Sequence, residues 1–522
     1  MAKLNFIDRA IGYVAPGVAA RRVRNRIALD FLARGYGGAN HGRLNNSWRT
    51  PNSSADTEIA QAAPWLRDRM RDLVRNNPHA ANAVAQLVSH IVGDGIVPRA
   101  KTGNARRDKK INKLFEKFSK ECDAGGKLDF YGIQDLVVRG MIESGDGLVQ
   151  RVMLGQNHKG AVPLKLKVIE TDQIDSTRAW ARREDGSAVQ GIGFDRNGKR
   201  SHYWLFDEHP GNSHINSISA TISRPVPAKD IAHAYELQRV SVRGVPWGSP
   251  VIASLYSLGT YEEAEIVRKK IESCLVGVLV GADDDDGIGV ELDGGDRRPA
   301  GVYDADGFVV EKFEPGMFAV AKGGKDIKFN SPAATGSYEA YKKSNLHTIA
   351  AGFRIPYALL SGDLSQVNYS STKVGMEAFK RLVSSVQWKI VIPMICQPIW
   401  EWFCEAAYLE RLIDTPDIDV EWTPPRFVSA DPKKDAEATV AEVRAGLKSP
   451  QRAIAETGYD PDEVIDDIEE WNAKLDAKGI VLDSDPRRTT KQGQAHPPDP
   501  SDSNEREEPD DGKSEGQQAK AA

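Results

Sequence analysis

The chain has 522 residues, of which 40% are hydrophobic, and its 69 lysines and arginines against 74 aspartates and glutamates give a net charge of −5. A chain of this length has room for several domains and a sizeable core. The near balance of charge excludes a protein that grips nucleic acid over its whole surface, because such proteins need a surplus of basic residues. The four cysteines show no C-x-x-C spacing and no nearby histidine cluster, so we expect no metal, no cofactor and no disulfide framework.

The sequence predicts neither a secretory signal nor a membrane partner. The first residues lack a sustained apolar stretch followed by a cleavage site. The longest uncharged apolar run around Cys274, CLVGVLVGA, falls far short of the roughly 20 residues that span a bilayer. We therefore expect a protein made in a cytoplasm and neither exported nor inserted.

Residues 1–58 form a basic and irregular arm. Within residues 1–50, nine lysines and arginines stand against two aspartates. A charge block of this kind is typical of a solvated arm, and it is also typical of a segment that meets phosphate or an acidic partner.

Helices are predicted next, over residues 59–92 and 105–155. Apolar residues recur at three- and four-residue steps in 59–92, and Asn77-Pro78 predicts a break there into two helices. The helical pattern of 105–155 ends at a G-D-G turn, Gly145 to Gly147, where glycine permits the positive φ of a tight turn.

From Leu148 to Ser241 the hydrophobic period changes to two, which predicts a β-rich region. Asp195 to Gly198 separates two such runs and is typical of a hairpin turn. Ser249-Pro250 then predicts the start of a long helix, since serine suits the N-cap and proline the first helical position. That helix is expected to end near Gly277–Gly281.

Residues 282–332 are turn-rich and predict short strands. The acidic run Asp283–Asp286 lacks the alternating spacing and final glutamate of an EF-hand loop, so a solvated turn is favoured over a calcium site. A second helix is predicted over 335–352, before Pro356.

A third, very long helix is predicted over 372–412, with kinks at Pro393 and Pro398, because proline removes a backbone donor. The stretch DIDVEWTPPRF predicts a strand, and two or three small helices follow over 433–478. The tail has almost no apolar residues, and 499–515 holds eight acidic residues against two basic ones, so we expect it to be disordered.

The segment SGDLSQVNYSSTKVGMEAFKR, from Ser361 to Arg381, contains an S-x-x-K at Ser370 and Lys373. This spacing occurs in acyl-transfer enzymes, but the companion S-D-N and K-T-G motifs are absent from the sequence. No Walker loop, G-x-S-x-G or H-E-x-x-H is present either. Capping of the third helix by the Ser370 and Ser371 hydroxyls is the favoured interpretation.

Five stretches resemble the portal proteins of tailed bacteriophages, specifically the lambda-like family. They are RDLVRNNPHAANAVAQLVSHIVGDGIVP (71–98), SGDGLVQR (144–151), RGVPWGSPVIASLY (243–256), FEPGMFAV (313–320) and IAAGFRIPYALLSGDLSQVNYSSTKVG (349–375). The last stretch is the most specific, and the resemblance covers roughly residues 60 to 430. It implies a mixed α/β portal fold that forms a ring, commonly a dodecamer, at one capsid vertex and threads double-stranded DNA during packaging and ejection.

The resemblance also implies an order of parts after the basic arm 1–58. They are an α/β wing (59–248), a stem helix (249–280), a β-rich clip (281–332), a second stem helix (333–360), a tunnel loop (361–371), a long kinked helix with a wing return strand (372–430), crown helices (431–480) and a disordered acidic tail (481–522).

On this resemblance the tunnel loop faces DNA and the clip binds partners. The DNA-facing residues would be Ser365, Gln366, Asn368, Tyr369, Ser370, Ser371 and Lys373. The clip residues would be Asp283, Asp284, Asp285, Asp286, Arg297 and Arg298. The implied partners are further copies of the chain, DNA bound without sequence preference, the terminase large subunit, head-completion or connector proteins, and the major capsid and scaffold proteins. The protein would reside in the virion, after assembly in the host bacterial cytoplasm, and would not be an enzyme.

The loop chemistry fits a conduit. Each phosphate neutralised by a lysine or arginine raises affinity through counterion release, so a channel that moves DNA should carry few basic residues. Two alternatives stay open: a serine hydrolase using Ser370 and Lys373, and a monomeric DNA-binding protein acting through the basic arm.

Overall fold

The computed structural model describes three parts of the chain. They are residues 50–274 except 51, 156, 184–185 and 213–221; three short strands between 278 and 322; and residues 338–480 except 364, 366–368, 426, 428–431, 457–458 and 460, together with 482 and 487. The expected basic arm, apart from its last residues, and nearly all of the expected tail lie outside the described residues.

The body begins with two helices, α3 (Ala55–Asn76) and α4 (Pro78–Ile91), which confirm the predicted break. The Asn77 side chain accepts hydrogen bonds from the backbone N–H groups of His79 and Ala80, at 3.0 and 3.2 Å. Pro78 occupies the first position of α4, where a missing N–H costs nothing.

The prediction of helix over 105–155 is correct only in part. The structure has α5 (Ala105–Ser119), a loop, α6 (Phe130–Ser144) and then the strand β2 (Asp146–Met153). In the loop, the Asp123 carboxylate accepts the backbone N–H groups of Gly125, Lys127 and Leu128, which competes with helical pairing. Gly145, at φ +94°, ends α6 in the left-handed conformation.

Two antiparallel sheets confirm the predicted β-rich region. In one, β2 lies between β3 (Leu164–Ile169) and β9 (Ile231–Tyr235). The other is a five-stranded meander. Its strands are β4 (Trp180–Arg183), β5 (Gly186–Val189), β6 (Ile192–Phe194), β7 (Arg200–Phe206) and β8 (Ser223–Pro227). The predicted hairpin turn joins β6 and β7, with Gly198 at φ +82°.

A long segmented helix runs through the core. It consists of α10 (Tyr369–Val386), the π-helical segment η5 (Gln387–Cys396) and α11 (Gln397–Leu409). Pro393 lies inside η5 and Pro398 in the first turn of α11, so the predicted distortion takes the form of a π-helix. Phe115 of α5 packs on Trp400 and Phe403, with ring centroids 5.3 and 5.1 Å apart.

Among the described residues, the stretch Val374–Leu409 is long and apolar enough to cross a membrane by length and composition, which the sequence reading missed. Half of its most apolar window is buried in the protein. Ile390, Ile395 and Ile399 belong to the main hydrophobic core, as expected for the central helix of a globular body.

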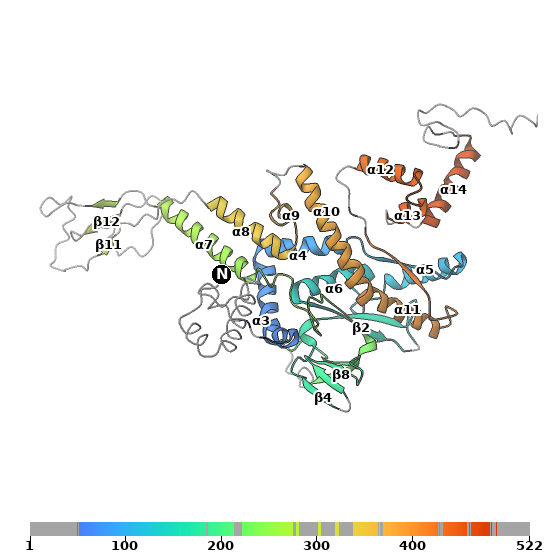
Figure 1. The fold of residues 1–522 in the computed structure, drawn as a ribbon, viewed down its shortest axis with the longest axis horizontal. Helices are drawn as coiled ribbons and strands as arrows, with labels where there is room; N and C mark the ends of the chain where they lie inside the picture. The colour runs from blue at the N-terminus through green and yellow to red at the C-terminus, as the bar shows by residue number, and fades with distance from the viewer. Residues whose placement is uncertain are drawn as a thin grey trace, which may run out of the picture.

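Two helices project from this body, α7 (Ile252–Cys274) and α8 (Tyr338–Phe353) (Figure 1). A small sheet lies at their far end, formed by β10 (Val278–Val280), β12 (Ala319–Lys322) and β11 (Gly301–Tyr303) in that order. The prediction of Ser249 as N-cap of the first helix is wrong. The helix starts at Ile252, and the Ser249 hydroxyl donates to the Pro246 carbonyl at 2.5 Å.

The remaining elements complete a mixed α/β fold. The predicted strand near 420 is β13 (Val420–Thr423), which pairs antiparallel with β1 (Val97–Ala100). Short 3-10 turns are η2 (Thr171–Gln173) and η4 (Ala228–Asp230). The predicted small helices are α12 (Pro432–Arg444), α13 (Pro450–Ala455) and α14 (Pro461–Lys478), which lie away from the projecting pair in Figure 1.

Candidate functional site

The projecting helices α7 and α8 are held to one another and to the body. The Glu262 carboxylate lies 2.7 Å from the Lys342 ammonium, and the Tyr261 ring stacks on Tyr338 with centroids 6.0 Å apart. At the body end, Leu255 of α7 and Phe353 of α8 are fully buried in the core. The pair is therefore anchored at one end and free to carry the small sheet at the other.

Arg354 fixes the turn after α8. Its backbone adopts φ +63°, which is uncommon for a residue other than glycine. Its guanidinium donates two hydrogen bonds to the Glu236 carboxylate, at 2.6 and 2.8 Å, and lies 4.3 Å above the Trp247 ring. Burial tends to raise the pKa of Glu236, but the bonds from Arg354 reverse this and lower it. The ion pair of Arg354 with Glu236 thus joins the end of α8 to the residue that follows β9.

The short helix α9 (Tyr357–Ser361) is tied to α4 and α8. The Asn82 amide donates to the carbonyls of Leu359 and Leu360, at 2.7 and 2.9 Å, and so satisfies acceptors at the helix C-terminus. The Tyr357 ring stacks on His347 with centroids 4.1 Å apart. Gly362 then ends the helix at φ +69°.

The loop after α9 begins with an Asx turn. The Asp363 carboxylate accepts the backbone N–H of Ser365 at 2.9 Å and its hydroxyl at 2.6 Å. These two bonds lower the pKa of Asp363. Ser365 is exposed, so this first part of the loop presents a hydroxyl and a carboxylate to its surroundings.

The structure places the sequence-predicted loop residues only in part. Helix α10 begins at Tyr369, so the connection from α9 spans 362–368 and the predicted cap by Ser370 and Ser371 is wrong, because both lie inside the first helical turn. Lys373 follows on the next turn. Gln366 and Asn368 lie outside the described residues, as do the side chains of Tyr369 through Lys373 and the clip residues Asp283–Asp286, Arg297 and Arg298.

A buried polar cluster lies at the root of the projecting pair, and sequence reasoning missed it. Asp146, at the start of β2, accepts from the Arg243 guanidinium at 2.9 and 3.0 Å, from His233 Nε2 at 3.1 Å and from the Gly244 N–H at 2.8 Å. Burial would raise the pKa of Asp146, but Arg243 and His233 outweigh it, and the pKa lies well below its usual value. The G-D-G at 145–147, which contains Asp146, was the one sequence feature that could have pointed to this cluster.

The hydrogen-bond pattern fixes the state of His233. Its Nδ1 accepts from the Arg200 guanidinium at 3.1 Å, so Nε2 carries the proton donated to Asp146. Burial lowers the pKa of His233, and the attraction of Asp146 only partly opposes this. The imidazole is neutral and buried, and the described neighbours include no serine or cysteine placed to act as a nucleophile with it. The cluster therefore joins β2, β9 and the segment entering α7.

Two further groupings were tested as ligand sites. Glu170, Asp172 and His209 bring one ligand atom each within 4.8 Å of one another, as a metal site would. However, the guanidinium groups of Arg67 and Arg71 lie 3.3 and 2.5 Å from the Asp172 carboxylate and already neutralise it. We assign no metal to this group.

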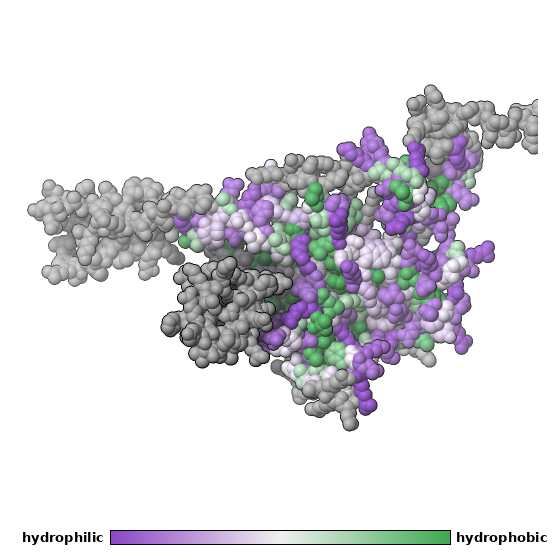
Figure 2. Space-filling view, viewed as in Figure 1, coloured by the Kyte–Doolittle hydropathy of each residue, from purple (hydrophilic) through white to green (hydrophobic). Residues whose placement is uncertain are grey.

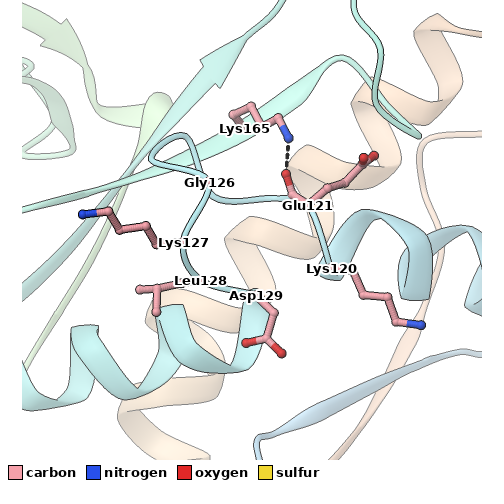
Figure 3. Close-up of a pocket in the computed structure, with 7 residues that line it drawn as sticks. All are labelled: Lys120, Glu121, Gly126, Lys127, Leu128, Asp129 and Lys165. Carbon is pink, nitrogen blue, oxygen red and sulfur yellow. Dashed lines mark hydrogen bonds between the residues drawn. The ribbon is translucent and has the colours of Figure 1, made fainter.

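An open hollow of about 530 Å³ lies beside the C-terminus of α5 (Figure 3). Three lysines line it, but Lys165 donates to the Glu121 carbonyl, and the amino groups of Lys120 and Lys127 point away on opposite sides. The described residues thus direct no free charged group into it.

Comparison with known proteins identifies the class. The chain is 26% identical over 474 residues to a probable portal protein of Halomonas phage phiHAP-1, covering 86% of this chain and 88% of the relative. It is 23% identical over 491 residues to the portal protein of Escherichia phage N15, covering 82% and 88%. Both relatives are portal proteins, which are structural proteins of the phage virion.

The sequence model of phage portal proteins, lambda family, matches residues 41–387, about two thirds of the chain. The chain therefore belongs to the lambda family of phage portal proteins. Solved structures of gene transfer agent particles also align with it. A neck computed with C12 symmetry covers 73% of this chain and 89% of its own at 15% identity, with a TM-score of 0.39. A chain from the native virion covers 78% and 100% at 14% identity, with a TM-score of 0.41.

Proposed function

We propose that copies of this chain close into a ring, a dodecamer of the portal type, through which double-stranded DNA enters the capsid and later leaves it. Family membership over residues 41–387 is the observation that carries this proposal. The ring belongs at one capsid vertex, in a virion assembled in the bacterial cytoplasm. No membrane and no catalytic step take part.

The distribution of exposed apolar side chains supports association with further copies. Large apolar residues that are more than half exposed lie on several elements: Trp65 of α3, Tyr256 of α7, Val374 of α10 and Trp388 of η5. Figure 2 shows hydrophobic residues, in green, among hydrophilic ones on one face of the body. A closed ring covers two faces of each subunit, so we propose that some of these residues lie at contacts between copies.

The proposed parts of the ring are those that the family resemblance implies. We propose that residues 59–248 form the wing, 249–280 and 333–360 the stem, 281–332 the clip, 361–371 the tunnel loop, 372–430 the long helix and return strand, and 431–480 the crown. The anchored turn at Arg354 and the Asn82 contacts to α9 support this proposal, because they tie the residues just before the proposed tunnel loop to the body.

The tunnel loop suits passage of DNA. The residues that would border DNA are Ser365, Gln366, Asn368, Tyr369, Ser370, Ser371 and Lys373, with one basic side chain among them. Hydroxyl and amide groups contact phosphates without reading sequence. The turn-rich clip, with Asp283–Asp286 and Arg297–Arg298, would bind the terminase large subunit during packaging and head-completion proteins afterwards, and the wing would meet capsid and scaffold proteins.

Electron microscopy and native mass spectrometry of the purified full chain test the assembly. Rings with a central hole and one dominant subunit number are expected. A chain that stays monomeric at the concentrations used for capsid assembly, with its secondary structure intact, would contradict the proposal.

A matched variant separates the ring from an arm-dependent DNA-binding protein. Arg21→Ala/Arg22→Ala/Arg24→Ala/Arg26→Ala removes four charges from the arm, and rings are expected to form as before. If the variant loses both rings and DNA contact, the arm and not the ring is the functional unit.

A further inference from the structure

A row of basic side chains runs along one face of α5. This basic stripe consists of Arg106, Lys110, Lys113 and Lys117. Their spacing of four, three and four residues places them on one face of a helix, and all four are exposed. The opposite face carries Ile111, Phe115 and Phe118, which are buried in the main core. The core thus holds the stripe rigidly outward.

The stripe carries more positive charge than the described residues around it neutralise. The Glu116 carboxylate lies near Lys113 and Lys117, but it is already paired with Lys120 at 2.6 Å. The ion pairs of α5 belong to residues beside the stripe, such as Lys109 with Asp466 at 3.2 Å and Arg107 with Asp414 at 3.9 Å. No direct ion pair between the described residues includes a member of the stripe. Like charges at helical spacing repel one another, so the stripe favours an acidic partner.

The C-terminal helix brings the end of the chain to α5. The contact between Lys109 and Asp466 places the N-terminal part of α14 beside α5. Arg487 lies 3.3 Å from Asp476, so the chain is still next to the last turn of α14 eight residues after Gly479. Asp466 and Asp476 are ten residues apart, which is about 15 Å along a helix.

An acidic segment of the same chain follows within reach. Residues 499–515 hold eight acidic residues against two basic ones. The acidic residues are Asp499, Asp502, Glu505, Glu507, Glu508, Asp510, Asp511 and Glu515. Twelve residues separate Arg487 from Asp499, and an extended chain of that length spans up to about 40 Å. The span of the extended chain exceeds the distance of about 15 Å along α14 from Asp476 back to Asp466, the residue of α14 that contacts α5.

We propose that the acidic segment 499–515 docks along the basic stripe of α5. Single exposed ion pairs contribute little, so the docking depends on several pairs at once and on the tether, which keeps the segment at high local concentration. The contact is therefore sensitive to salt and can be displaced by a stronger polyanion. Duplex DNA is the competing occupant, and the tether favours the segment over it. This proposal does not depend on ring formation.

Zero-length carbodiimide cross-linking of the full chain tests the docking, because it couples carboxylates only to lysines in direct contact. Cross-links from 499–515 to Lys110, Lys113 and Lys117 are expected, and they should fall roughly ten-fold when salt shortens the screening length from about 10 Å to about 3 Å. Equal coupling of the segment to Lys127, Lys199 and Lys229, which are exposed lysines elsewhere, would overturn the proposal.

A variant with the segment neutralised gives a second readout. In Glu507→Gln/Glu508→Gln/Asp510→Asn/Asp511→Asn, acetylation of the stripe lysines should increase several-fold, while Lys127, Lys199 and Lys229 stay unchanged as internal controls. Unchanged stripe reactivity in this variant contradicts the docking. If short duplex DNA then protects the stripe equally in both proteins, the stripe is a nucleic-acid site and the proposal is wrong.

Discussion

At the scale of single residues, the cluster around Asp146 shows how a buried charge is retained. Asp146 is fully buried, and its carboxylate is satisfied by Arg243, His233 and the Gly244 N–H. Arg243 is itself buried and also donates to the Ser176 hydroxyl and the Thr171 carbonyl. These bonds connect the central strand β2 with the segment that enters α7, so the cluster fixes where α7 leaves the body.

Arg243→Met should destabilise the protein strongly. The substitution leaves Asp146 buried without its guanidinium partner, and breaking a buried pair in this way costs about 3–5 kcal/mol. The loss of stability is measured as the shift in the urea midpoint at which the body unfolds. Arg444→Met, at an exposed position of α12, is the matched control and should change stability by less than about 0.5 kcal/mol. Equal midpoints for the two variants would show that the cluster is not structural.

His233 makes stability depend on pH. Its pKa in the folded protein is lowered by burial below the ordinary value of 6.5, so below that pH the unfolded chain takes up a proton that the folded protein does not. Stability is therefore fully present above pH 6.5 and is lost as pH falls through the lower folded pKa. Burial lowers the pKa values of His79 and His202 as well, in the same direction.

His233→Gln should reduce the slope of unfolding free energy against pH by an amount that corresponds to up to about one proton. Glutamine keeps polar groups at the site but does not titrate. Urea midpoints of the native protein and the variant, measured from neutral to mildly acidic pH, provide the comparison. An identical slope for the two proteins would mean that His233 is protonated in the fold.

At the scale of elements, periodicity predicts most helices and strands, and local chemistry explains the exceptions. The break at Asn77, the hairpin at Asp195 and the strand near Val420 were read correctly from short patterns. The helix predicted over 105–155 failed because Asp123 binds three backbone N–H groups and Gly145 stops α6. The prediction of Ser249 as an N-cap was wrong because its hydroxyl donates a hydrogen bond to the Pro246 carbonyl.

The position of the connection between α9 and α10 could be predicted from the sequence, but the contacts that hold it could not. The stretch 349–375 indicated a polar connection between two helices, which the structure has. The contacts that hold it join residues far apart in sequence, since Arg354 binds Glu236 and Asn82 binds Leu359 and Leu360. The turn at Arg354 is also hidden in the sequence, because its positive φ occurs at an arginine and not at the glycine that usually indicates such a turn.

Two glycines near the loop should respond to alanine with opposite sign. Gly362 has φ +69° and open space around it, so Gly362→Ala costs about 1–2 kcal/mol from backbone strain alone. Gly375 lies inside α10, also in open space, and Gly375→Ala should stabilise by about 1 kcal/mol through helix propensity. Urea midpoints of the two variants measure both effects. A shift in the same direction for both would contradict the assigned end of α9 or course of α10.

At the scale of the whole molecule, the conduit requires that DNA pass without being held. Asn368→Lys adds one positive charge per subunit to the proposed tunnel loop, and a ring would multiply this charge by the number of subunits. Each added phosphate contact strengthens DNA retention through counterion release. We expect normal rings and slower packaging in a defined in vitro system, with the defect relieved as salt is raised. Asn157→Lys, the same substitution at an exposed wing position, is the control and should package normally.

The central claim is that the connection between α9 and α10 borders the hole of a closed ring. A cryo-electron microscopy reconstruction of the assembled protein measures this directly, as the distance of Asp363–Tyr369 from the symmetry axis. The account predicts that this segment forms the narrowest part of the channel, beside the inner ends of α7 and α8. A reconstruction with this segment on the outer rim of the ring would contradict it.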